Sequence, residues 1–192
     1  MSLWPKPPIK PIAEHPRFLL TKNHIDHLNH NMESEELRPV YQLMEKYAKE
    51  ELVTNLPYNE NGNYSPELEL KLEARALLYV LGKKDDAYAK ETIRHAREYL
   101  DTVVFPMHVG DITRQLGYAM VMGAMVYDWC YAHLTDDDKQ WFIGKFKALA
   151  AAKEILCRRR WSESTCKSTR RNNPFRLISR GKNGAVRYVR GV

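Results

Sequence analysis

The sequence predicts an all-α protein built from antiparallel helical hairpins. Apolar residues recur at three- and four-residue spacing over most of residues 21–156, which is the period of a helix packed on one face. Short segments rich in capping and turn residues separate these stretches, and short connections favour neighbouring helices that run antiparallel. No strand-like alternation precedes residue 157. The chain has 192 residues, 44% of them hydrophobic, which is enough for one buried core.

The first part of the chain is expected to be extended. Residues 1–20 form this lead-in, because prolines hold themselves and the residues before them in extended geometry. Thr21 is expected to cap a short first helix, and Ser34 to begin a second one. Residues 55–65 are predicted to be a loop, because Asn, Gly and Pro supply turn conformations there and no period survives.

Helix signals are strongest from Ser65 onward. Ser65 is predicted to cap a helix that has Pro66 in its first turn, and Gly82 to end that helix in the left-handed conformation. Asp85 is expected to open the next helix, which Pro106 would end.

Two further helices complete the predicted domain. A long apolar helix rich in small residues is expected over residues 112–131. Thr135, followed by three aspartates, is predicted to cap the last helix, whose apolar pattern continues to Ile155. Residues 21–156 therefore form the predicted helical domain.

The remaining residues, 157–192, differ in composition from the rest. The segment 155–192 holds 11 of the 30 Lys and Arg residues but only one of the 24 acids, which leaves 19 basic and 23 acidic residues in 1–154. The net charge of +6 therefore belongs to the tail. Arginines interleaved with Trp161, Phe175 and Tyr188 are typical of nucleic-acid-binding segments, but no module motif accompanies them. We expect an irregular basic tail.

Several classes of protein are excluded or disfavoured. No stretch approaches the roughly 20 consecutive apolar residues of a membrane span, so no membrane association is predicted. Cys130, Cys157 and Cys166 are too few and too irregular for a disulfide framework or a four-ligand zinc site. The first residues lack the apolar core of a secretory leader, and the sequence alone assigns no compartment.

His24, His27 and His30 suggest a metal site at first sight. On one helix, however, His24 and His30 would point about 240° apart, so the three side chains could not face one ion. A solvated helix face explains them better, and we predict neither a metal nor a cofactor. For Cys130, inside an apolar helix, we expect a buried and inert thiol.

Asp111 and Arg114 are the candidate binding residues. They lie three positions apart at the start of the long apolar helix, beside a nearly uncharged stretch. Such a pair is either a buried structural bridge or the wall of a polar cleft, and spacing alone favours the bridge. Asp128 carries the same ambiguity and could hold a neighbouring helix terminus.

Four segments, in this order and spacing, point to a known family. They are His15-Pro16-Arg17-Phe18-Leu19-Leu20, Leu72-Glu73-Ala74-Arg75-Ala76-Leu77, Gly110-Asp111-Ile112-Thr113-Arg114 and Val126-Tyr127-Asp128-Trp129-Cys130-Tyr131. Over about residues 14–156 the chain resembles the N-terminal helical region of heparinase II and related heparinase II/III-like polysaccharide lyases.

The resemblance implies that the hairpins form part of an incomplete α/α toroid around a cleft for an acidic, uronic-acid-containing polysaccharide. Such lyases cleave by β-elimination, in which the carboxylate is neutralised, a base removes the C5 proton and an acid protonates the leaving oxygen. Arg114 falls on the family's cleft arginine, whose guanidinium suits a carboxylate or sulfate. The resemblance therefore ranks the cleft interpretation of Asp111 and Arg114 above the structural one. Family members are typically exported and carry β-sandwich domains after the toroid.

The resemblance stops abruptly after Glu154. The family places a Gly-His-x-Ser-Glu segment after the last matching helix, and catalytic Tyr, His and Asn residues further on. Here Ser162-Glu163 lacks the Gly-His pair, and no histidine follows His133, so no catalytic residue is assigned. Together with the change of charge, this break suggests a truncated or frame-shifted product whose tail 157–192 is not native and which lacks the downstream domains.

Three functions follow from these observations. The leading interpretation is the N-terminal fragment of a heparinase II/III-like lyase, expected to be inactive alone. The second is a non-catalytic helical carbohydrate-binding or scaffold module. A nucleic-acid binder that uses the basic tail ranks last. The sequence leaves open whether the chain alone is an enzyme.

Overall fold

The structure is a computed structural model that describes residues 12–60, 62–105 and 112–161, with side chains described as far as residue 151. Its elements are α1 (Lys22–Asn31), α2 (Arg38–Lys49), α3 (Pro66–Val80), α4 (Asp86–Thr102), α5 (Ile112–Trp129), the 3-10 helix η1 (Tyr131–His133) and α6 (Asp136–Trp161). Within these described ranges the chain forms no strand, and one isolated bridge joins Asn59 to Gly62. The predicted all-α class is therefore confirmed.

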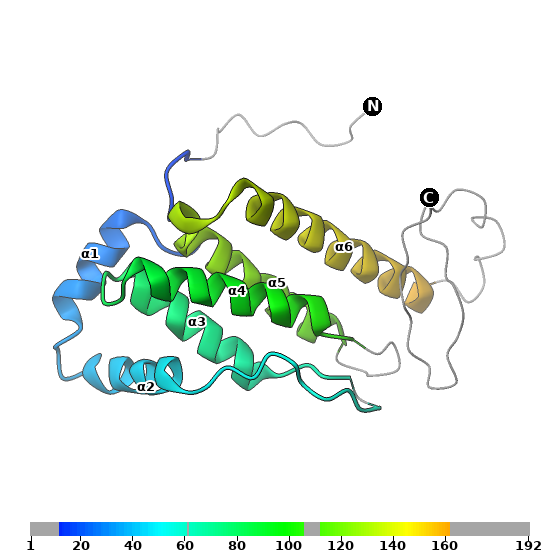
Figure 1. Cartoon of the computed structure of the whole chain (residues 1–192), viewed down its shortest axis with the longest axis horizontal. Coiled ribbons are helices and arrows are strands. Elements are labelled where there is room, and N and C mark those ends of the chain that lie inside the picture. The colour runs from blue at the N-terminus through cyan, green and yellow to red at the C-terminus, as the bar shows by residue number, and fades with distance from the viewer. Residues whose placement is uncertain (1–11, 61, 106–111, 162–192) are drawn as a thin grey trace.

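Consecutive helices from α2 to α6 reverse direction (Figure 1). Helices α2, α4 and α6 run one way, and α3 and α5 run the other way. Helix α3 packs against α2, α4 and α5, and α5 packs against α3, α4 and α6. The two helices α3 and α5 are thus parallel neighbours, and their N-terminal ends lie at the same end of the molecule.

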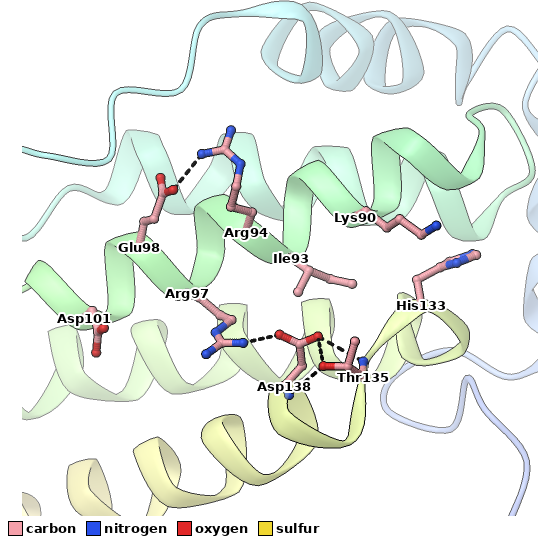
Figure 2. A pocket seen from close by; sticks show the side chains of 9 residues that line it. All are labelled: Lys90, Ile93, Arg94, Arg97, Glu98, Asp101, His133, Thr135 and Asp138. Carbon is pink, nitrogen blue, oxygen red and sulfur yellow. Dashed lines mark hydrogen bonds and ion pairs between the residues drawn. The ribbon is translucent and has the colours of Figure 1, made fainter.

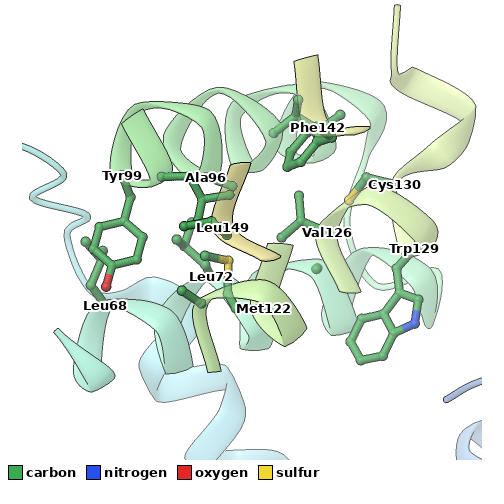
Figure 3. Close-up of a cluster of buried hydrophobic side chains, with 14 of the residues drawn as sticks. Leu68, Leu72, Ala96, Tyr99, Met122, Val126, Trp129, Cys130, Phe142 and Leu149 are labelled. Carbon is green, nitrogen blue, oxygen red and sulfur yellow. The ribbon is translucent and has the colours of Figure 1, made fainter. Parts of the chain in front are cut away.

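The hydrophobic core lies between α3, α4, α5 and α6 (Figure 3). Its largest fully buried side chains include Leu72, Tyr99, Met122 and Phe142. Gly123 lets α5 approach its neighbours closely. A Cβ added there would lie 2.9 Å from the Phe146 ring and 3.1 Å from a methyl group of Leu100, distances at which real carbon atoms repel.

The predicted caps of the later helices are confirmed. The Ser65 hydroxyl accepts a hydrogen bond from the Leu68 N–H at 3.2 Å, and the Asp85 carboxylate accepts one from the Tyr88 N–H at 2.9 Å. At the start of α6, the Thr135 hydroxyl accepts from the Asp138 N–H, and the Asp138 carboxylate accepts in return from the Thr135 N–H. Gly82 has a φ of 73°, as expected of a left-handed helix stop.

Some predicted boundaries differ from the structure. Helix α2 begins at Arg38, so Ser34 precedes it in a turn. The reason is Pro39, which lacks an N–H and fits a helix only in its first turn. Helix α5 ends at Trp129 and gives way to η1, and α6 continues to Trp161. Asp111 and residues 162–192 lie outside the described residues.

None of the helices in the described part of the chain is long and apolar enough to cross a lipid bilayer.

Candidate functional site

Two of the segments that carry the family resemblance meet in the structure. The backbone N–H groups of Arg17 and Phe18 donate to Asp128 Oδ2 at 2.7 and 2.8 Å, and His15 Nδ1 lies 2.5 Å from Asp128 Oδ1. The Trp129 indole N–H donates to the Phe18 carbonyl at 3.0 Å. Asp128 is buried, and it holds residues 15–18 rather than a helix terminus. We call these five residues the clasp.

Arg114 lies at the opposite end of α5. It is an exposed residue in the first turn of that helix, at the end of the molecule where α3 also begins. Tyr118 follows it by one helical turn, so the two side chains share a face of α5, and Tyr118 is 53% exposed. The predicted partner Asp111 is outside the described residues, so the structure describes no pairing between Asp111 and Arg114.

A buried carboxyl group lies at this same end, in the first turns of α3. Glu69 is 3% exposed, and the Tyr99 hydroxyl donates to its Oε1 at 3.2 Å. Burial raises the pKa of Glu69 to about 7, although hydrogen bonds from Tyr64 and Tyr99 lower it in part. The Glu69 carboxyl group is therefore close to half protonated at neutral pH.

Three further side chains, all less buried than Glu69, belong to this cluster. Burial, and then the charge of Glu69, raise the pKa of Tyr64 well above its usual value, so its phenol keeps its proton. Tyr118 and Glu73 lie close enough to Tyr64 for their charges to raise its pKa further. Burial raises the pKa of Glu73 as well. Tyr118, one helical turn from Arg114 on α5, thus adjoins this cluster of proton-bearing groups.

Asn63 positions Tyr64. It is 8% exposed, and its amide group donates to the carbonyls of Leu56 and Thr102 and accepts from the Val104 N–H at 2.7 Å. These bonds fasten the loop before α3 to the end of α4. Sequence reasoning identified this loop only by its turn composition and missed Asn63, Tyr64 and Glu69 as candidate site residues.

A groove of about 430 Å³ lies between α4 and the start of α6 (Figure 2). Its cations are mostly paired within the protein: Arg97 contacts Asp138, and Arg94 contacts Glu98 at 2.6 Å. At the rim, Lys145 Nζ forms an ion pair with Asp101 Oδ1 over a distance of 3.1 Å. Because these ion pairs neutralise most of its cations, the groove is a contact region between two helices and is poorly suited to bind a polyanion.

The histidines of α1 have a local role. His24 Nδ1 accepts a hydrogen bond from the Thr21 N–H at 3.2 Å, at the start of the helix. No group of three or more potential metal ligands occurs among the described residues. Cys130 is fully buried, as expected, and burial raises the pKa of its thiol to about 12, so little reactive thiolate is expected at neutral pH.

Comparison with models of known protein families finds no match, and a search of curated proteins finds none either.

Proposed function

We propose that this chain is the N-terminal helical region of a heparinase II/III-like polysaccharide lyase. In this proposal the hairpins form part of an incomplete α/α toroid, and the end that carries Arg114 binds a uronic-acid-containing acidic polysaccharide.

The observation that carries the proposal is the clasp. Its two segments lie at the two ends of a stretch of more than 100 residues that resembles the family, and each supplies hydrogen-bonding groups that fit the other. A resemblance by chance would not require His15 and Asp128 to be partners. The alternation of helix directions also supports a toroid, because α3 and α5 are parallel neighbours joined by the antiparallel α4.

The chemistry around Arg114 supports the proposed ligand. A guanidinium group binds a carboxylate or sulfate through paired N–H donors. Tyr118 and the protonated Tyr64 add hydroxyl groups that can donate to saccharide oxygens. Glu69 is too deeply buried to reach a C5 proton directly. We therefore propose binding without turnover, because no described residue is placed as the base.

The test is a titration of the whole chain with uronate oligosaccharides. Arg114→Ala is expected to weaken binding about tenfold, as loss of one charge-assisted contact would. Lys90→Ala, at an exposed cation on α4, is the matched control and should leave the affinity unchanged. Added salt should weaken binding to the wild type more than to the Arg114 variant.

An ultraviolet assay for unsaturated uronate, run on the same samples, tests the second half of the proposal. A steady product signal abolished by Arg114→Ala would show that catalytic groups are present in this chain. Equal binding by the wild type and the Arg114→Ala variant would refute the proposed binding end.

A further inference from the structure

Glu69 is a buried carboxyl group whose described hydrogen-bond partners are phenols. The Tyr99 hydroxyl donates to its Oε1 at 3.2 Å, and the Tyr64 phenol also bonds to it. Among the described residues no Lys, Arg or His contributes to its pKa, and the one other charge that does, that of Glu73, has the same sign. Two phenols replace only part of the hydration that a carboxylate has in water. The ionised form of Glu69 is therefore poorly stabilised where it lies.

The charged groups on the neighbouring helices do not compensate Glu69. From α5 the phenol of Tyr118 borders the cluster, and Arg114 is exposed and does not contribute to the pKa of Glu69. Lys71, on α3 itself, is engaged at 3.0 Å by the carboxylate of Glu50, just after α2, and at 2.8 Å by a glutamate of its own helix. Relief of the ionised form must therefore come from water.

Tyr64 is the phenol that can move without opening the core. Tyr99 is fully buried between the helices, whereas Tyr64 is half-buried in the loop before α3. The Tyr64 ring packs against Phe105, with ring centroids 6.1 Å apart and planes at 43°. Asn63 fastens the backbone of the loop, so the Tyr64 side chain can turn about its own bonds while the loop stays in place.

We infer that Glu69 and Tyr64 form a pH-sensitive switch at this end of the molecule. While Glu69 is protonated, Tyr64 stays bonded to it and packed against Phe105. When Glu69 releases its proton to solvent, Tyr64 turns away and water reaches the carboxylate, because hydration stabilises the charge more than one phenol does. The inference does not rest on the proposed function, since no ligand takes part.

The size of the effect follows from the two environments of the carboxyl group. The pKa of Glu69 is about 7 in the packed arrangement, and it would return toward the ordinary 4.5 once the group is hydrated. Ionisation therefore favours the hydrated arrangement by up to about 300-fold, a factor that grows between these two pH values. An open form populated at about 1 part in 300 in acid would be as common as the packed form at about pH 8.

The experiment is an NMR titration of the full chain with isotope-labelled tyrosine, phenylalanine and glutamate side chains, from about pH 5 to about pH 9. The Glu69 carboxyl resonance should titrate near pH 7. The nuclear Overhauser effect between the Tyr64 and Phe105 rings should weaken with the same midpoint. Tyr64→Phe assigns the Tyr64 resonance.

Three variants connect the movement to Glu69. Glu69→Gln cannot ionise and should keep the contact between Tyr64 and Phe105 at every pH. Glu73→Gln removes a like charge and should move the midpoint to lower pH. Glu67→Gln, at an exposed position on the same helix, is the matched control and should leave the midpoint unchanged.

Three results would each overturn the inference. They are titration of the wild-type Glu69 carboxyl at its ordinary pH, titration near pH 7 with an unchanged contact between Tyr64 and Phe105, and loss of that contact with an unchanged midpoint in Glu69→Gln. The first two come from the wild-type chain alone, so they decide the question even if Glu69→Gln does not fold. Because no saccharide is added, failure here is distinct from failure of the proposed function.

Discussion

Asp128→Ala is the perturbation with the largest expected effect on stability. The substitution leaves three donors without their acceptor: the N–H groups of Arg17 and Phe18, and Nδ1 of His15. Hydrogen bonds to a charged group contribute about 1.5–3 kcal/mol each, but neighbouring bonds are not additive. Some of the released lead-in can also reach water. We therefore expect a loss of about 3–5 kcal/mol in the free energy of unfolding.

Urea denaturation of the purified chain measures this loss. Asp128→Asn should lower the free energy of unfolding by less, about 1–2 kcal/mol, because the asparagine amide keeps one acceptor oxygen for the backbone N–H groups. Asp136→Asn is the matched control, since Asp136 is fully exposed in the first turn of α6, and it should change stability by less than about 0.5 kcal/mol. In thermal unfolding, Asp128→Ala should lower the midpoint by roughly 10 °C.

Limited trypsin digestion separates a local effect from a global one. The bond after Arg17 is held in place by the clasp, so native wild-type protein should resist cleavage there. Asp128→Ala should be cut at Arg17 under conditions in which the core remains folded. A variant with wild-type stability and no new cut at Arg17 would refute the role assigned to the clasp.

Three further predictions concern the site and the core. The pKa of Glu69 is raised in the folded state, so the folded protein binds this proton more tightly than the unfolded chain does. The free energy of unfolding should therefore fall by up to about 3 kcal/mol as the pH rises from about 4.5 to 7. Glu69→Gln should remove this pH dependence when urea denaturation is measured at several pH values. Gly123→Ala should lower the free energy of unfolding by about 1–2 kcal/mol in the same assay, because the new methyl group meets Phe146. Gly117→Ala has open space around it and should raise that free energy by up to about 1 kcal/mol. Equal effects of the two substitutions would contradict the packing described. Asn63→Ala should lower the free energy of unfolding by about 2–3 kcal/mol and change the near-ultraviolet circular dichroism of the tyrosines. An unchanged spectrum would show that the loop keeps its conformation without this side chain.

Helix starts could be predicted from the sequence where the cap is local. Ser65, Asp85 and Thr135 each bond to a backbone N–H three residues further along the chain, so the signal and its effect lie within one turn. The prediction that α2 starts at Ser34 is wrong, because Pro39 restricts the backbone more strongly than a serine cap and fits only the first turn of a helix.

The site could not be predicted in the same way, because its contacts join distant segments. Asp128 bonds to residues about 110 positions earlier, so a pattern within α5 cannot show which partner it holds. Asn63 meets Thr102 only after α3 and α4 have packed together. Glu69 has the pattern of an ordinary polar helix residue, and its burial follows from the approach of Tyr99 on α4. Only the family resemblance predicts Arg114 as a cleft residue, because its spacing from Asp111 favours a structural bridge.

The most direct test of the proposed function compares one uronate oligosaccharide with its carboxyl-reduced counterpart, which has the same size and hydroxyl pattern without the charge. The wild-type chain should bind the uronate form about tenfold more tightly, and Arg114→Ala should remove that preference while keeping the fold. Equal affinity of the wild-type chain for the two oligosaccharides would contradict the proposal that the Arg114 end recognises a uronate carboxylate.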